Sequence, residues 1–188
     1  MHLQLGASNG TLLDGSESWG EVAEGALASW NSGMTNMRFT VIRDSTSALG
    51  YGNSANNVFF SSTVYGEGWD SRTLAVTLSR TNSNGVRLEG DVIFNNNLSW
   101  NSYRGPLRSS TGGGTLNDFR RVALHEFGHV LGLGHPDDIG QVVSAAMNST
   151  SSNTDGLTAD DIAGVRAIYD SGGSVTGGVT LYMQNPVS

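Results

Sequence analysis

One short stretch constrains this chain more than any other feature. Residues 122–135 read VALHEFGHVLGLGH and carry the pattern His-Glu-x-x-His-x-x-Gly-x-x-His. On a helix, His125 and His129 are four residues apart, so both imidazoles leave the same face, one turn above the other. Gly132 can adopt the positive φ that ends a helix, which turns the chain and brings His135 toward the same point. The spacing therefore predicts three imidazoles that converge on one metal ion.

The residue types also predict what this metal site does. Three neutral imidazoles leave one position of a tetrahedral Zn²⁺ open, as in catalytic rather than structural zinc sites. Glu126 lies about 100° around the helix from His125, beside the metal rather than on it. A carboxylate there can take the proton from water that the metal activates. The alternative, a helix with scattered buried histidines, is disfavoured because every histidine except His2 lies in the motif.

Two further stretches carry a family resemblance. Residues 144–148, Ser-Ala-Ala-Met-Asn, resemble the Met-turn of the metzincin zinc endopeptidases, in which the methionine, here Met147, lies beneath the zinc-bound histidines. Residues 157–169 resemble the last helix of the matrixins, the matrix-metalloproteinase branch. In the serralysin branch a tyrosine two residues beyond the methionine ligates zinc, and that position is Ser149 here. The matrixin branch therefore fits better, most specifically over residues 119–169.

The resemblance implies a fold, a domain plan and an activity. The fold is an α+β metzincin-like zincin domain, with a twisted mixed sheet, a long active-site helix, a Met-turn and a C-terminal helix. Residues 1–170 would form the catalytic domain, with an upper subdomain of residues 1–135 and a lower subdomain of residues 136–170. Residues 171–188 would form a Gly/Ser/Thr-rich tail, in which a short alternating segment around Leu181 would be an added strand or a stub toward a further domain. The implied activity is hydrolysis of peptide bonds in proteins by zinc-activated water, with Glu126 as general base and acid.

The resemblance also points to a substrate-binding strand. In matrixins the strand that resembles residues 73–78 is the sheet edge that pairs with substrate. An unpaired edge is a ready template for an extended peptide. The predicted substrate-binding residues are Thr73, Leu74, Ala75, Val76 and Thr77.

Departures from the matrixin pattern bear on the metal content. Val76 and Ile93 stand where matrixins have histidines of a second, structural zinc, so the sequence predicts one catalytic Zn²⁺. Asn95 and Leu98 replace acidic residues of a calcium site, and Ca²⁺ prefers charged oxygen ligands. Calcium would need other carboxylates, although solvated loop carboxylates are the commoner case. The candidates are Asp44, Glu67, Asp70, Asp137, Asp138 and Asp155.

Hydrophobic periodicity and turn residues predict the other elements. We expect an extended arm or strand within residues 1–17 and a helix over residues 18–31. Thr115 with Asp118 would cap the motif helix, and Thr158 with Asp161 would cap a last helix that stops near Gly172. The expected strands are Arg38–Arg43, Asn57–Phe60, Thr73–Leu78 and Leu88–Phe94.

Composition narrows the partners and the compartment. A net charge of −7 without a basic run disfavours nucleic acid and anionic membrane surfaces. No apolar run is long enough to span a membrane. The absence of cysteine excludes disulfides and a Cys-based zinc site. The start lacks the features of a signal peptide, so a secreted enzyme would be represented here by its mature form. We expect an extracellular monomer that acts on protein or peptide substrates.

Two other classes of function remain open. The chain could be a zinc-binding but proteolytically inactive adhesion or recognition module, which the presence of Glu126 disfavours. It could also be an inhibitor or structural module with a coincidental motif, which should hold no stoichiometric metal.

Overall fold

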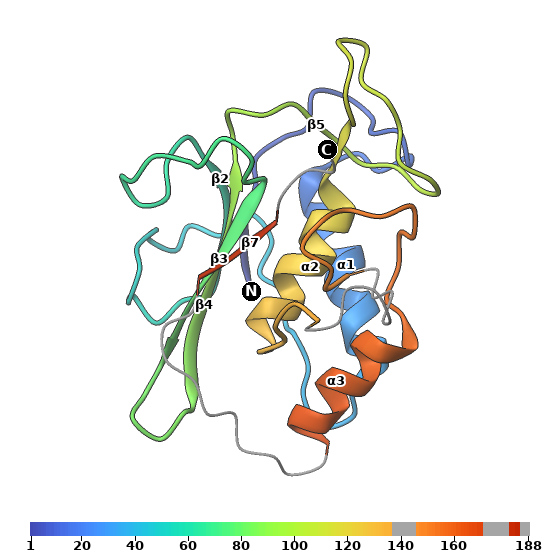
Figure 1. The fold of residues 1–188 in the computed structure, drawn as a ribbon. Helices are drawn as coiled ribbons and strands as arrows, with labels where there is room; N and C mark the ends of the chain where they lie inside the picture. The colour runs from blue at the N-terminus through green and yellow to red at the C-terminus, as the bar shows by residue number, and fades with distance from the viewer. Residues whose placement is uncertain (137–145, 171–180, 185–188) are drawn as a thin grey trace.

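A five-stranded mixed sheet forms one layer of the molecule (Figure 1). The computed structural model describes residues 1–136, 146–170 and 181–184. Across the sheet the order is β1 (His2–Gln4), β2 (Asn57–Ser61), β4 (Arg87–Asn95), β3 (Ala75–Thr81) and β7 (Leu181–Gln184). The first three strands are parallel, whereas β3 pairs antiparallel with β4 and with β7. A small second sheet pairs β5 (Trp100–Asn101) with β6 (Asn117–Asp118).

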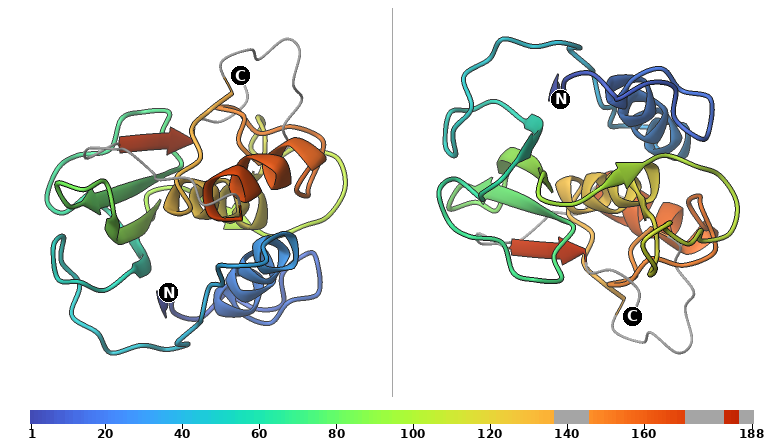
Figure 2. Two further views of the ribbon diagram at one scale, coloured as in Figure 1. Left: turned by 90° about the horizontal axis from the view of Figure 1, so that it is seen from below. Right: turned by 90° about the horizontal axis from the view of Figure 1, so that it is seen from above.

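The helices of the described residues lie on one side of the main sheet, as Figures 1 and 2 show. They are α1 (Trp19–Gly33), α2 (Phe119–Val130) and α3 (Ala159–Tyr169). This arrangement confirms the α+β class, the mixed sheet, the motif helix and the C-terminal helix that the sequence predicts. No helix among the described residues is long and apolar enough to cross a membrane.

The core lies between the sheet and helices α1 and α2. The apolar stripe of α1 is buried there, and the Trp30 indole donates a hydrogen bond to the Leu124 carbonyl of α2 at 2.9 Å. At one end, rings from the sheet meet Phe119 at the start of α2, with a centroid separation of 4.5 Å to Phe94. Such packing fixes α2 against the sheet, which sets the position of the motif histidines.

Some predicted boundaries are wrong, for physical reasons. Residues 38–43 are not a strand, because only Ile42 forms a bridge, to His2, and most of the side chains remain exposed. The N-cap of α2 is Asp118 alone, whose carboxylate accepts from the Arg120 amide, while Thr115 bridges to Ser109. The last helix ends at Tyr169 rather than near Gly172, and its predicted capping box of Thr158 and Asp161 is confirmed.

The C-terminal region contains one described element beyond residue 170. The segment around Leu181 is an added strand, β7, one of the two predicted alternatives. Several predictions lie outside the described residues: most of the loop before the Met-turn, with Asp137 and Asp138; Ser144 and Ala145 of the Met-turn; and the rest of the tail.

Candidate metal centre

The three motif histidines converge, as their spacing predicts. Nε2 of His125 lies 2.8 Å from Nε2 of His129 and 3.1 Å from Nε2 of His135. Nitrogen ligands about 2.0–2.1 Å from a tetrahedral Zn²⁺ stand about 3.3 Å from one another. The nitrogens therefore surround a point close to that geometry. Among the described residues, this is the one group of three or more His, Cys, Asp or Glu side chains that could hold a metal ion.

Local backbone structure places the third histidine. Gly132 has φ of +100°, in the region that glycine adopts without strain. Its amide donates to the His129 carbonyl at 2.9 Å, and the Leu133 amide donates to the Gly128 carbonyl at 3.0 Å. These bonds close the helix end and reverse the chain, so that His135 returns toward the two helical histidines.

Backbone carbonyls fix the tautomers of two of the rings. His125 Nδ1 donates to the Ala146 carbonyl, and His129 Nδ1 donates to the Leu133 carbonyl at 2.7 Å. A carbonyl can only accept, so each ring carries its proton on Nδ1 and directs the Nε2 lone pair at the shared point. This outer support is typical of metal-ligating histidines.

Burial keeps these rings neutral, as metal ligands must be. Loss of solvation, together with a smaller contribution from the neighbouring His135, lowers the pKa of His125 to about 3. The pKa of His129 falls well below its ordinary value for the same main reason, and that of His135 is also lowered by burial. Converging neutral lone pairs repel one another unless a cation lies between them, so this donor set fits Zn²⁺.

Glu126 follows His125 on α2 and is fully buried. Its Oε2 lies 2.5 Å from the Thr77 hydroxyl, and its Oε1, also buried, has no hydrogen-bond partner among the described residues. Loss of solvation raises the pKa of Glu126 to about 8, against the opposing effect of the Thr77 hydrogen bond. A buried carboxylate with one free oxygen beside a cation site is suited to taking up a proton.

Met147 packs against the motif helix. Its side chain is buried, and a Cβ added at Gly128 would lie 2.2 Å from its sulfur atom. The preceding residue, Ala146, supplies the carbonyl that binds His125. The described residues of the predicted Met-turn thus lie against α2 and contact one histidine directly.

The predicted substrate-binding residues occupy two kinds of position. Thr73 and Leu74 precede β3, whereas Ala75, Val76 and Thr77 lie within the strand, and all five side chains are buried. The expectation that this edge is unpaired is wrong: β7 of the same chain pairs with it, with Val76 opposite Met183 and Thr77 opposite Tyr182. The alternating residues around Leu181 predict that the tail can form a strand, but they do not predict that this strand pairs with β3.

The region around Val76 and Ile93, where the sequence predicts that a structural zinc is missing, is apolar. Val76 pairs with Ile93 across β3 and β4, and both pack with Phe59 and Trp69 in a small second cluster. The Trp69 indole donates to the Ser61 carbonyl at 3.1 Å, and the Tyr65 hydroxyl donates to Asp91 at 2.6 Å. Packing and hydrogen bonds therefore hold the loop before β3.

No group of three or more carboxylates that could hold a metal ion is found among the described calcium candidates, which are Asp44, Glu67, Asp70 and Asp155. Asp155 instead pairs with Arg104 at 2.8 Å and accepts from the Gly105 amide at 2.7 Å.

Two hydrogen bonds at the candidate centre are not predicted from the sequence. Thr77, predicted to touch substrate, also bonds to Glu126, and Arg87 of β4 donates to the His129 carbonyl at 2.8 Å. For Thr77 a signal exists in the sequence, since a hydroxyl follows the apolar run Leu74, Ala75 and Val76. For Arg87 no sequence pattern identifies the partner.

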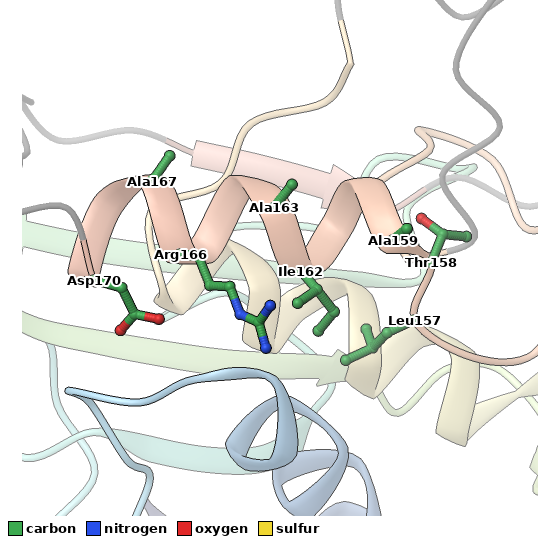
Figure 3. Close-up of a pocket in the computed structure, with 8 residues that line it drawn as sticks. All are labelled: Leu157, Thr158, Ala159, Ile162, Ala163, Arg166, Ala167 and Asp170. Atoms are coloured by element: carbon green, nitrogen blue, oxygen red, sulfur yellow. The ribbon is translucent and has the colours of Figure 1, made fainter.

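A surface hollow of about 780 Å³ runs along α3 (Figure 3). In that view Ile162 and Arg166 point toward α1, whereas Ala163 and Ala167 point to the opposite side. The Arg166 guanidinium donates to the Gly33 carbonyl at 2.8 Å. None of the motif histidines lines this hollow, so it is separate from the candidate metal centre.

Comparison with known proteins finds one family over most of the chain. The family model Peptidase_M10, described as matrixin, matches residues 8–170. Interstitial collagenase of Bos taurus is 37% identical over 87 residues, which covers 45% of this chain and 16% of the collagenase. Matrilysin of Rattus norvegicus is 33% identical over 93 residues, 50% of this chain and 32% of that protein. Metalloendoproteinase 1-MMP of Arabidopsis thaliana is 42% identical over 52 residues, 28% of this chain and 14% of that protein. The matches thus span a third or less of each of these relatives.

Proposed function

This chain belongs to the matrixin family of zinc metalloendopeptidases, and from that membership we propose that it cleaves peptide bonds within proteins. One observation carries the proposal: the ligand atoms of the three motif histidines lie within 4.8 Å of one another, and Glu126, the residue after His125, is fully buried. The proposed ligands of one catalytic Zn²⁺ are His125, His129 and His135, with Met147 packed against their helix.

The three histidines and Glu126 have separate roles in the proposed reaction. Zn²⁺ held by the three imidazoles would supply a Lewis acid that polarises the scissile carbonyl and makes water nucleophilic near neutral pH. Glu126 accepts the proton of the attacking water and later donates it to the departing amine. Burial raises the pKa of this carboxylate above its ordinary value, which favours its uptake of a proton. No covalent intermediate is needed.

The substrate would bind as an extended peptide along β3. Antiparallel pairing of this edge with β7 supports that pose, because it demonstrates that the outer amides and carbonyls of β3 accept a strand. The side chain after the scissile bond would enter the space between α2 and the segment that follows Met147. The substrates would be extracellular proteins or peptides, met by a secreted monomer. Calcium binding stays a prediction, because the described residues contain no cluster of carboxylates that could hold the ion.

A casein-cleavage assay tests the proposal. The purified full chain should degrade casein, lose this activity in excess chelator and regain it when Zn²⁺ is restored. A protein that binds one Zn²⁺ tightly and leaves casein and a mixed peptide library intact would instead be a recognition module. A protein without stoichiometric metal would contradict both interpretations.

A further inference from the structure

The Thr77 hydroxyl contacts Glu126 at two places. Its oxygen lies 2.5 Å from the carboxylate Oε2 and 3.1 Å from the backbone carbonyl oxygen of the same residue. Both residues are fully buried, with Thr77 on β3 and Glu126 on α2. A charge-assisted hydrogen bond shielded from water is among the stronger interactions that a side chain makes.

This contact determines which carboxylate oxygen remains available. A glutamate side chain has a soft final torsion, so an isolated carboxylate would rotate freely about it. With Oε2 held by Thr77, rotation stops and Oε1 is left as the buried oxygen without a partner among the described residues. The free oxygen is then presented in one orientation, which is the requirement for a proton acceptor.

The double contact also suits a residue that gains and loses a proton. When Glu126 is ionised, the Thr77 hydroxyl donates to Oε2. When Oε1 has taken up a proton, Oε2 is still an acceptor, and the Thr77 hydroxyl can donate to it or to the Glu126 carbonyl at 3.1 Å. A single hydroxyl with two acceptors in reach therefore satisfies the two states without a movement of the backbone.

We propose that Thr77 is a positioning residue that holds the Glu126 carboxylate in its reactive orientation, an inference that rests on the proposed function of Glu126. Thr77 does not touch the reacting atoms in this role. It acts through Glu126 on the step in which the proton moves, and not on the binding of the substrate. The effect is thus expected in kcat.

Three variants test the proposal. Thr77→Val keeps the branched shape and removes the hydroxyl, and should lower kcat about tenfold to a hundredfold with KM changed less than about threefold. Thr77→Ser retains the hydroxyl and should stay within about threefold of the wild-type kcat. Thr81→Val makes the same change on the same strand, away from Glu126, and should leave kcat unchanged.

A second readout is independent of activity. Crystal structures of the zinc-loaded variants should place the Glu126 carboxylate in several orientations in Thr77→Val and in one in Thr77→Ser. Wild-type kcat in Thr77→Val, or a single wild-type carboxylate orientation in that variant, would overturn the proposal. A wild-type chain without peptidase activity would defeat the proposed function, while the crystal structures would still decide the orientation.

A different observation concerns the C-terminal strand. β7 lies antiparallel on the outer edge of β3, and its Cα atoms approach those of α2 within 8 Å. The register places Ala75 opposite Gln184 and Leu78 opposite Leu181. One side of a strand can pair with only one partner, so β7 and an extended substrate cannot share this edge.

We propose that Leu181–Gln184 is an intramolecular competitor of the substrate, an inference that rests on the proposed pose along β3. A tethered segment has an effective concentration that a free peptide must overcome. The consequence is a raised KM with an unchanged kcat, because catalysis proceeds normally once the edge is free.

Proline substitution tests this in the full chain. The double variant Tyr182→Pro/Met183→Pro removes two amides from β7 and should release it from the sheet. We expect a KM at least about threefold lower with the same kcat, whereas Val187→Pro, beyond β7, should behave as wild type.

The competition can also be measured as peptide binding, without catalysis. A fluorescent peptide with the sequence of residues 179–188 should bind the zinc-loaded double variant at least about threefold more tightly than the wild type, by the same factor as the change in KM, measured by anisotropy. Amides of residues 75–78 should also exchange hydrogen faster in the variant without peptide. Equal peptide affinity in the two proteins would overturn the competition, and equal exchange would show that β7 does not cover this edge in solution.

Discussion

At the scale of single residues, the metal centre depends on carbonyl oxygens as much as on side chains. The spacing of the motif predicts which residues converge, namely His125, Glu126, His129 and His135. It does not predict that Ala146 and Leu133 supply the carbonyls that orient two of the rings. Those contacts depend on how the chain returns to the helix, which residue order alone does not specify.

Glu126→Ala tests the role of the carboxylate. The variant should retain nearly one Zn²⁺ per chain, because the imidazoles are unchanged, and should lose kcat by about two to four orders of magnitude. Metal analysis and peptide kinetics on the same preparation measure the two effects. A variant that keeps more than about a tenth of the wild-type kcat would contradict the assignment of Glu126 as general base.

Asp91 should make stability depend on pH. Its carboxylate is buried and accepts from the Tyr65 hydroxyl and from the Asn57 amide at 2.9 Å. Burial raises its pKa from 3.8 to about 6, so the folded state binds this proton more tightly than the unfolded state does. The resulting stabilisation is complete below about pH 3.8 and is lost as the pH rises through 6.

Asp91→Asn removes this titration and keeps a carbonyl for the Asn57 amide. The melting temperature of the variant, relative to wild type, should therefore rise between pH 4 and pH 7. Subtraction of the two pH profiles cancels other carboxylates, such as Glu24 with its lowered pKa. A difference that is independent of pH over this range would refute the effect.

At the scale of elements, close packing seats the motif helix. A Cβ added at Gly128 would lie 2.2 Å from the Met147 sulfur and 2.9 Å from a ring carbon of Trp30. Gly128→Ala should therefore destabilise the protein by about 1–3 kcal/mol, since overpacking a core forces its neighbours to move. Thermal melts measure the change.

The matched control is Gly25→Ala in α1, where an added Cβ meets nothing within 4 Å. Alanine is the better helix former, so this variant should be unchanged or slightly more stable. Equal melting temperatures for Gly128→Ala and Gly25→Ala would contradict the close contact between α2 and Met147.

Periodicity predicts the elements that bury a regular face. The stripe of α1 is confirmed because its apolar residues are buried, and β2 and β4 are confirmed as strands, although β4 is buried on both faces, Glu89 and Asp91 included. In residues 38–43 a polar residue separates Phe39 from Val41, and yet the segment forms only the bridge at Ile42. A strand needs a partner along its length, and β1, three residues long, does not provide one.

At the scale of the whole molecule, pairing between distant segments is what sequence patterns leave open. The matrixin-like sequence predicts the mixed sheet and the helices, which the structure confirms. It places residues 73–78 at an edge without identifying the occupant, since β7 lies about a hundred residues further along the chain. The sequence likewise does not predict the partner of Thr77, because Glu126 lies on a helix and Thr77 on the sheet.

The metal content of the whole chain is the last prediction. We expect one tightly held Zn²⁺, because Val76 and Ile93 occupy the positions of the family's structural-site histidines and pack with Phe59 instead. Carboxylates alone would compete poorly for a second zinc, since nitrogen and sulfur ligands dominate structural zinc sites.

Chelation should therefore abolish activity and leave most of the fold intact, because the loop before β3 is held by Trp69 packing and by the bond from Tyr65 to Asp91 rather than by metal. Metal analysis after exhaustive dialysis gives the stoichiometry, and circular dichroism before and after chelation reports the fold. Two zinc ions retained per chain, or loss of secondary structure on chelation, would show that an apolar cluster does not replace the second site.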